Sequence, residues 1–505
     1  MSLIKANAVQ VGQSPTATQN FTLAVPPSPD GTIKLARGNS GATTQDVLSV
    51  DASGNINGLV KTTGSTTARS LANRFADVVN VKDFGAVGDG VTDDTAAIQA
   101  AFNSGRGIYF PIGNYVINNK ISITNKPVKI IGEHPVRSSL WFNSTSAGIE
   151  ITFGASNFDA IQIENIQFWK RVVSTLDTAV KINPSPAGVT VPLVTVNNVS
   201  VLGQWRHGFI LDSNSICNFK NVVVDGDQSH TQTCFYITGE SFENTFISCA
   251  AYSANTGFLI DGTSEGIYID SCSIVNVIRG IVKTHSSGAE PWISIRGTHI
   301  NANSVCIRLE RTLQSVISNC LLYAGIGTSG PKLGWIGIDL TNALNEDIII
   351  SNNILNGLTY PSAMIGVSIN VGDRIIVQSN SFISTFTGIN AGVGCINSKF
   401  QDNKYTLLTN NVINTNTSNS HYWSEGESFY FNNTTNGLRI SSRGSGLSPA
   451  VEAIGGDSNI NINLATKGTG LLSYGTFQSQ VDTPTNGYIT ILDKSGNVRK
   501  LAVIS

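Results

Sequence analysis

Charged residues are scarce in this sequence. Asp, Glu, Lys and Arg make up 13% of its 505 residues, against roughly 25% in ordinary soluble domains. The formal net charge is −2, and there is no run or stripe of basic residues. Capture of nucleic acid by bulk electrostatics needs clustered Lys and Arg, so we expect no nucleic-acid partner.

Long apolar runs and paired cysteines are also missing. No segment approaches the roughly 18 apolar residues of a membrane span, and residues 1–21 lack the apolar core of a signal peptide. We therefore expect a protein made in a cytoplasm without a cleaved signal and without a membrane span. The seven cysteines show no CxxC pair and no metal-ligand spacing, so we expect reduced, buried thiols, no metal and no cofactor.

A single amphipathic helix is predicted near 93–104, inside the segment Val79–Ile117. Thr92–Asp94 would supply caps and negative charge at its N-terminus, and Gly105 would end it. One face of this helix is apolar and must pack on a core. That face consists of Ile98, Ala101 and Phe102.

The same segment has a distinctive order of residues. It contains V-x-D-F-G-A-x-G-D-G-x-x-D-D-T-x-A-I-Q-A-A, followed by Y-F-P-x-G-x-Y. This order resembles the first segment of the pectate-lyase-like superfamily of right-handed parallel β-helices, which includes polygalacturonases and phage tailspikes. The resemblance implies the fold but not the chemistry, because the superfamily includes hydrolases, lyases, epimerases and non-catalytic adhesins.

A repeat of the form apolar-x-polar-x-x-apolar follows the helix. Its polar third position recurs every 22 to 33 residues, at Asn165, Asn198, Asn221, Ser248, Ser271, Gly297, Asn319, Asn352, Ser379 and Asp402. One apolar strand signature per coil is typical of a β-solenoid, so we expect roughly eleven or twelve coils between 108 and 410. Cys249, Cys272 and Cys320 each follow the third position, which predicts one stacked core column.

We therefore predict an all-β fold: a right-handed single-stranded parallel β-helix with a short N-terminal capping helix and a C-terminal β-rich cap. Residues 1–75 would form a virion-attachment or leader segment, 76–410 the β-helix, and 411–505 a trimerisation or capping region. Two short strands are expected between Thr43 and Leu59, around a turn at Asp51–Asn55.

Two longer excursions between repeats are expected, at 175–192 and 324–335. Long loops on a solenoid usually border its binding face. A last coil with an open strand edge needs a cap or a partner, which the C-terminal segment would supply.

Hydrolysis of a glycosidic bond usually needs two carboxylates. Asp225 and Asp227 stand at i and i+2 at a predicted strand end, and Glu240 and Glu243 belong to the next coil. We predict these four as catalytic candidates. The alternative for Asp225–Asp227 is an Asx-type turn, and acidic residues that precede several strands are also explained as turn or solvent-facing residues.

Candidate substrate-binding residues surround these acids. Aromatic side chains offer apolar faces to sugar rings, and Arg can pair with the carboxylate of an acidic sugar. The candidates are Trp205, Arg206, His207, Tyr236, Tyr252 and Glu265. Packing is the alternative for the Trp, and a structural or solvated role is the alternative for the His.

The resemblance and these residues together predict a homotrimeric phage tailspike that binds and hydrolyses a bacterial surface polysaccharide during host adsorption. Its N-terminus would attach to a phage tail or baseplate protein, and the resemblance alone implies the trimer. The alternatives are a non-enzymatic receptor-binding spike and a polysaccharide lyase on the same fold. No clustered carboxylates of a calcium loop are visible, and Lys is sparse between 200 and 280, so the lyase is less favoured.

Overall fold

The fold is almost entirely β, and it is known here from a computed structural model. The residues that it describes are 8–11, 15–16, 21–24, 32–39, 42–105, 107–124, 126, 128–152, 160–172, 177–183, 193–285, 288–325, 334–341, 344–358, 364–414, 422–424, 428–433, 436–441, 450–455, 488–492 and 498–502.

The N-terminal part is a small antiparallel sheet. Its strands, in spatial order, are β1 (Ala8–Val11), β2 (Phe21–Ala24), β3 (Ile33–Asn39), β4 (Ala42–Val50), β5 (Ile56–Val60) and β6 (Arg69–Ser70), followed by helix α1 (Leu71–Phe75). The predicted strand pair is confirmed, since Val50 pairs with Ile56. The turn between them is closed by Asp51 Oδ1, which accepts from the backbone N–H groups of Ser53 and Asn55 at 2.9 Å.

The capping segment closes the first coil of the β-helix. Its elements are β7 (Val78–Asn80), the 3₁₀-helix η2 (Val81–Phe84), β8 (Asp89–Asp93), α2 (Thr95–Asn103), β9 (Gly107–Phe110) and β10 (Gly113–Ile117). The predicted helix and its apolar face are confirmed, because Ile98, Ala101 and Phe102 are all buried. Gly105 follows the helix with φ +73°, a left-handed conformation that favours glycine.

One predicted cap is wrong. Asp94 stands at the N-cap position, but its side chain makes no capping hydrogen bond to α2. Instead the buried carboxylate accepts from the backbone N–H groups of Val87 at 2.6 Å and Gly88 at 3.1 Å. Asp94 therefore holds the Gly-rich turn against the start of the helix. Asp93, its neighbour, accepts from Thr95 N at 3.0 Å.

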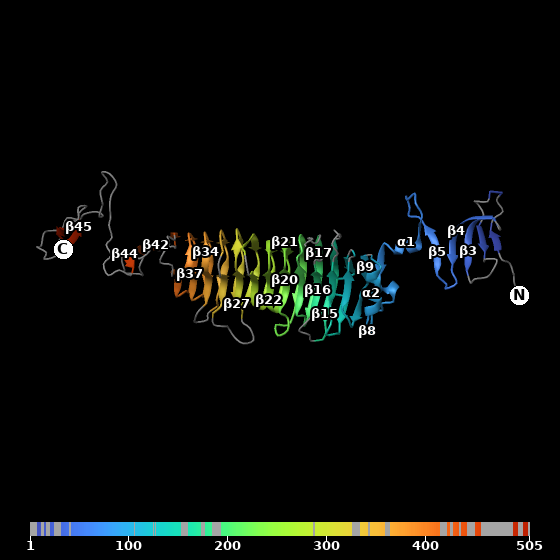
Figure 1. The fold of residues 1–505 in the computed structure, drawn as a ribbon, viewed down its shortest axis with the longest axis horizontal. Coiled ribbons are helices and arrows are strands. Elements are labelled where there is room, and N and C mark those ends of the chain that lie inside the picture. Colours follow the sequence, from blue (N-terminus) through green and yellow to red (C-terminus); the bar gives the residue numbers. More distant parts are fainter. Residues whose placement is uncertain are drawn as a thin grey trace.

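The body is a right-handed parallel β-helix of about 11 turns, which confirms the predicted fold and runs as a rod along the molecule (Figure 1). Its strands are β11 (Ile121–Thr124), β12 (Val128–Gly132), β13 (Ser138–Phe142), β14 (Ile149–Thr152), β15 (Ile161–Lys170), β16 (Thr178–Asn183), β17 (Val194–Gly203), β18 (His207–Asp212), β19 (Cys217–Asp225), β20 (Thr233–Thr238), β21 (Ser241–Ile247), β22 (Ala250–Asp261), β23 (Ser264–Asp270), β24 (Ser273–Thr284), β25 (Glu290–Pro291), β26 (Ile293–Arg296), β27 (His299–Leu309), β28 (Thr312–Leu313), β29 (Val316–Ser318), β30 (Leu321–Ala324), β31 (Ile336–Leu340), β32 (Ile349–Ser351), β33 (Ile354–Asn356), β34 (Ile365–Asp373), β35 (Ile376–Gln378), β36 (Ser381–Ile383), β37 (Thr387–Ile396), β38 (Lys399–Gln401), β39 (Lys404–Thr406) and β40 (Asn410–Asn414).

Each coil contributes to three sheets. The first sheet consists of the strand segments that precede the polar residue of the repeat, such as Asn198. The second sheet consists of the segments that follow that residue. The third sheet consists of the next strand of each coil, such as β18. All ten predicted third positions have a left-handed backbone, with φ between 52° and 56°. They are Asn, Ser, Asp or Gly. The repeat found in the sequence is therefore the sharp bend between the first and second sheets, which brings the chain round once per coil.

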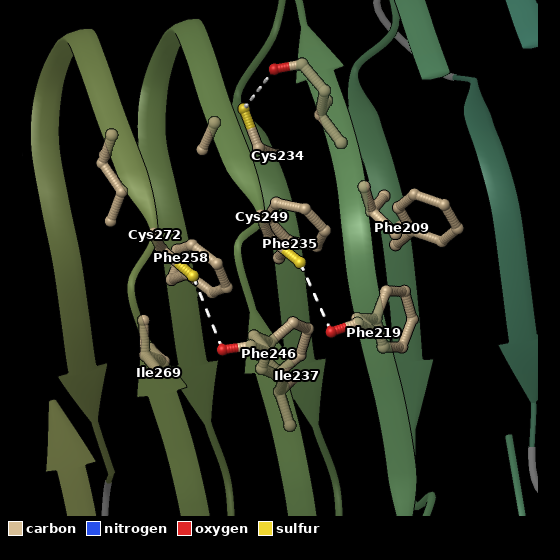
Figure 2. Packing of buried hydrophobic residues seen from close by; sticks show 14 of the residues in the cluster. Phe209, Phe219, Cys234, Phe235, Ile237, Phe246, Cys249, Phe258, Ile269 and Cys272 are labelled. Carbon is tan, nitrogen blue, oxygen red and sulfur yellow. Dashed lines mark hydrogen bonds between the residues drawn. The ribbon is translucent and has the colours of Figure 1, made fainter. Parts of the chain in front are cut away.

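Aromatic stacks fill the interior (Figure 2). On the third sheet, Phe235 stacks on Phe209 and on Phe258, with ring centroids 5.8 and 4.5 Å apart. On the first sheet, Phe219 stacks on Phe246 at 5.0 Å. Register pairing places these rings directly above one another, so each coil covers the apolar surface of the next.

The predicted cysteine column is confirmed. Cys249, Cys272 and Cys320 are buried, and each thiol approaches a main-chain carbonyl of a first-sheet strand on the preceding coil, at 3.5 to 3.8 Å (Figure 2 shows the first two). All seven cysteines are free and buried. Burial raises the pKa of Cys320 to about 11, so this thiol is protonated at neutral pH.

Asparagines continue this column toward the C-terminal end. Asn353 Nδ2 donates to Asn380 Oδ1, and Asn380 Nδ2 donates to Asn403 Oδ1, each at 3.0 Å. The same amide oxygens accept from the backbone N–H of the previous coil, and Asn353 Oδ1 accepts from Cys320 N at 2.9 Å. The ladder thus satisfies main-chain donors that the tight bend would otherwise leave buried and unpaired.

The two predicted excursions are described only in part. The first contains strand β16, so Thr178–Asn183 belongs to the third sheet and not to a loop. Residues 175–176 and 184–192 of the first excursion, and 326–333 of the second, lie outside the described residues.

Short strands follow the last coil. They are β41 (Tyr422–Ser424), β42 (Ser428–Asn433), β43 (Asn436–Ser441), β44 (Ala450–Gly455), β45 (Tyr488–Leu492) and β46 (Val498–Ala502). Strand β41 pairs in parallel with β38, and β42 to β44 continue from it as antiparallel strands. Among the described residues, the first-sheet edge of the last coil, at β38, is therefore covered by β41.

The left-handed bend gives a first testable prediction. The Asn352 side chain is exposed and its φ is 56°, so Asn352→Val changes backbone strain with little change in packing. We expect a loss of about 1–2 kcal/mol in the free energy of unfolding, measured by chemical denaturation. Asn352→Gly should keep wild-type stability, because glycine adopts this conformation without strain. Equal losses in both variants would contradict the strain argument.

Candidate polysaccharide-binding groove

An open groove of about 480 Å³ lies on the outer face of the third sheet, near the N-terminal end of the β-helix. Most of its lining is polar, with groups of both charge signs. The lining residues are Lys120, Thr145, Ser146, Ala147, Gly148, Ile149, Glu150, Asp177, Thr178, Lys181, Arg206, His207 and Ile210.

Three consecutive strands, β14, β16 and β18, form the floor. In register, Glu150 pairs with Lys181, and Lys181 pairs with Ile210. Alternation places the flanking residues of each strand in the core, so these middle residues face outward. The walls come from the turns that lead into these strands, and they bring Asp177 and Arg206 to the groove.

Two lysines neutralise Glu150. Its carboxylate forms ion pairs with Lys120 and, at 3.6 Å, with Lys181, and it accepts from Asn183 Nδ2 at 2.8 Å. The hydrogen bond from Lys120 is the main cause that lowers the pKa of Glu150, so this carboxyl is ionised at neutral pH. A carboxylate held in this way is suited to accept hydrogen bonds from ligand hydroxyls, but not to donate a proton.

The second groove acid, Asp177, is neutralised by a lysine that is buried in the protein. Its carboxylate pairs with the buried Lys170, whose ammonium also lies 5.3 Å from the centre of the Trp205 ring. The backbone carbonyl of Asp177 accepts from the N–H groups of Arg206, at 3.0 Å, and His207, at 3.3 Å. This ion pair therefore fixes the turn that presents Arg206 and His207 to the groove.

His207 is a neutral hydrogen-bonding group in the groove. It is 8% exposed, and burial together with the neighbouring Arg206 guanidinium lowers its pKa to about 4. Its ring centroid lies 5.6 Å from that of Tyr236. The buried Nδ1 has no hydrogen-bond partner among the described residues. A buried polar atom without a partner is costly, so a ligand that supplied one would be favoured.

Arg206 and Tyr236 complete this cluster. Arg206 Nε donates to Gln232 Oε1 at 3.2 Å, and no carboxylate of the described chain forms an ion pair with it. Tyr236 lies directly after Ile210 in the outward register column, and its hydroxyl donates to Asp261 Oδ2 at 3.3 Å. Three of the predicted substrate-binding residues, Arg206, His207 and Tyr236, are thus brought together on one face.

The predicted carboxylate pair does not share a strand face. Strand β19 ends at Asp225, which lies on the second sheet, and Asp227 belongs to the turn that follows. Asp227 Oδ1 accepts from Ser229 N at 2.9 Å, which is the Asx-type turn named as the alternative. Asp227 Oδ2 also accepts from Gln204 Nε2 at 2.9 Å and lies 3.0 Å from His230 Nδ1.

The remaining candidates lie elsewhere on the β-helix. Glu240 is in the bend between the third and first sheets, and Glu243 and Glu265 are at the start of the first sheet, so the four predicted catalytic acids do not converge. Tyr252 is on the second sheet, in register with Asp225. Trp205 as a sugar platform is wrong, because it is 1% exposed and packs edge-on against Phe142 in the core.

Glu150, Asp177 and Lys181 were missed by sequence reasoning. A usable signal was present, since Glu150 stands between Ile149 and Ile151 as Lys181 does between Val180 and Ile182, and both apolar pairs are buried. The alternation around Lys181 was overlooked because residues 175–192 were expected to form a loop, whereas Thr178–Asn183 is strand β16. Among the described residues there is no group of three or more His, Cys, Asp or Glu side chains that could hold a metal ion. None of the described helices is long and apolar enough to cross a membrane.

Comparison with known proteins agrees with the fold. Residues 78–282 match the family described as rhamnogalacturonase A/epimerase, pectate lyase-like. This segment is therefore similar to pectate-lyase-like β-helices, and the resemblance noted in residues 79–117 is confirmed.

Individual relatives share short segments with the chain. Mannuronan C5-epimerase AlgE5 of Azotobacter vinelandii is 57% identical over 44 residues, 8% of this chain and 4% of that protein. The pre-neck appendage protein of Bacillus phage B103 is 44% identical over 50 residues, 10% of this chain and 6% of that protein. The matches thus span less than a tenth of the length of these relatives.

A solved structure is similar in fold over most of the chain. The catalytic domain of a GH87 α-1,3-glucanase, in complex with nigerose, has a TM-score of 0.50 and 14% identity, and the likeness covers 78% of this chain and 74% of that one.

The buried His207 predicts a specific pH dependence of stability. Because its pKa falls from 6.5 in the unfolded chain to about 4 in the folded protein, its contribution is complete above pH 6.5 and is lost as the pH falls toward 4. Between pH 7 and pH 4, wild type should lose about 3 kcal/mol more unfolding free energy than His207→Asn. Denaturation at pH 8, where His207 is neutral in both states, gives the structural cost of the substitution. If the unfolding free energies of wild type and His207→Asn differ by the same amount at every pH, the lowered pKa of His207 is contradicted.

Proposed function

We propose that this protein is a phage tail component that binds a bacterial surface polysaccharide in the groove. The observation that carries the proposal is the cluster of Arg206, His207 and Tyr236 beside the paired acid Glu150. The groove offers a guanidinium that has no carboxylate partner among the described residues and a neutral imidazole, and the aromatic ring of Tyr236 lies beside that imidazole. Sugar hydroxyls need such a mixture of donors, acceptors and apolar surface.

The comparisons support both halves of this proposal. The matched appendage protein belongs to a phage, which favours a virion component. The matched epimerase acts on mannuronan and the glucanase is an α-1,3-glucanase, which favours a polysaccharide as the ligand. An open groove along a rod-shaped solenoid fits a chain ligand better than a small enclosed one.

The assembly follows from the same proposal. We place the N-terminal sheet at the attachment to a phage tail or baseplate protein, and we assign trimerisation to the C-terminal strands. A homotrimer would expose one groove per subunit, and several weak sites on one particle would add up to strong adsorption to a cell surface. Sedimentation of the full chain tests the trimer.

Binding should depend on Arg206. Arg206→Gln removes the charge, so affinity for a matching polysaccharide from a panel of purified capsules and O-antigens should fall about tenfold, measured by calorimetry. Arg296→Gln is the matched control, because Arg296 is exposed on the first sheet at the end of β26; it should bind as wild type does. Binding that survives in Arg206→Gln would move the site away from the groove.

Hydrolysis of the bound polysaccharide stays a prediction. After incubation with the protein, shorter fragments without new ultraviolet absorbance indicate hydrolysis, and fragments that absorb as unsaturated sugars indicate elimination. If hydrolysis occurs, Asp225→Asn and Asp227→Asn should abolish it while the protein stays folded. Unchanged polysaccharide would leave the non-enzymatic receptor-binding spike, and full cleavage by both variants would place the catalytic acids elsewhere.

A further inference from the structure

Two arginines lie close together on the third sheet, outside the groove. Arg279 is on β24 and pairs with Val305 on the next strand, β27, and Arg308 lies three residues after Val305 on that strand. Both side chains are partly buried. The positive charge of Arg308 disfavours the nearby charge of Arg279, so an anion close to both side chains would be stabilising.

The protein compensates only one of the two. Arg308 Nε donates to Asp339 Oδ2 at 3.0 Å on the following strand. Arg279 donates to the amide oxygen of Asn255 at 2.9 Å, and no carboxylate in the described chain forms an ion pair with it. The other acid nearby, Glu310, accepts from the Thr284 hydroxyl at 3.2 Å.

Desolvation acts on the same groups. Burial, together with the charge of Arg308, lowers the pKa of Arg279, and burial raises the pKa of Asp339 against the attraction of Arg308. A guanidinium cannot lose its proton in a protein, so Arg279 stays charged and half-desolvated. An anionic ligand group would offset that cost.

The pair shares a face with the groove. Arg279 stands three strand steps from His207 in one register column, through Thr233 and Thr256. At about 4.8 Å per step this is roughly 14 Å along the rod. Arg308 lies in the column of Tyr236, three steps further along. A polysaccharide that lies along the rod in the groove would therefore pass both arginines.

We propose that Arg279 and Arg308 form an anion-binding position that holds a carboxylate, sulfate or phosphate substituent of the polysaccharide bound in the groove. This inference rests on the proposed function and adds the class of ligand, an acidic polysaccharide with a charged group a few sugars away from the unit at Arg206. Arg279 is the principal contact, because its guanidinium has donors left over after the bond to Asn255.

The test uses defined probes and the full chain. Hexamers of galacturonate and of mannuronate, with their carboxyl-reduced neutral counterparts, are titrated by calorimetry into wild type, Arg279→Gln and the matched control Arg296→Gln. At least one acidic hexamer should bind wild type more tightly than its neutral counterpart. Arg279→Gln should lose about tenfold in affinity for that acid and nothing for the neutral hexamer.

Each outcome separates this inference from the proposed function. If no hexamer and no polysaccharide of the panel binds wild type, the proposed function fails. If glycans bind and Arg206→Gln weakens them, but Arg279→Gln binds the acidic hexamer as wild type does, only the anion position is overturned. If inorganic phosphate displaces the acidic hexamer and binds as tightly as the hexamer does, the two arginines bind simple anions and not a polysaccharide, and the proposal is overturned. A change of sedimentation in Arg279→Gln would show that a second copy of the chain supplies the anion, which also overturns the proposal.

Discussion

A left-handed residue once per coil is the constraint on which the rest of the structure depends. Most L-residues lose about 1–2 kcal/mol in this conformation, yet ten successive coils place Asn, Ser, Asp or Gly there with nearly the same φ. The bend fixes where the first sheet ends and the second begins. Since these ten coils bend at the equivalent residue, their neighbouring strands stay in register although coil lengths vary, and the variable length is confined to the other turns.

This constraint explains why so much of the fold was predictable. The small polar residue at the bend recurs at the same place in an apolar frame, so the repeat could be aligned without any structure. The residue after the bend always points inward, which is why the column of Cys249, Cys272 and Cys320 followed from the same alignment. Its continuation by Asn353 and Asn380 could not be foreseen, because a buried amide is acceptable only when the next coil supplies the matching amide.

The site was harder to predict for a physical reason. A solenoid separates residues that are close in sequence and joins residues a coil apart. Asp225 and His230 are five positions apart in the sequence. Asp225 ends strand β19 on the second sheet, whereas His230 lies in the turn that follows this strand. Conversely, Glu150 and Lys181 meet across strands β14 and β16. Grouping candidates by sequence distance therefore selected acids that do not converge, while the adjacent Arg206 and His207 lie together because they share one turn.

Scarcity of charge makes the remaining charges informative. Charged residues make up only 13% of the sequence, and a partly buried ionised side chain is costly unless an opposite charge or hydrogen bonds balance it. Glu150 is balanced by Lys120 and Lys181, and Asp177 by Lys170. Because both groove acids are neutralised within the protein, the guanidinium of Arg206 is left to set the sign of the groove. The groove therefore presents positive charge to a ligand even though the chain as a whole is slightly acidic.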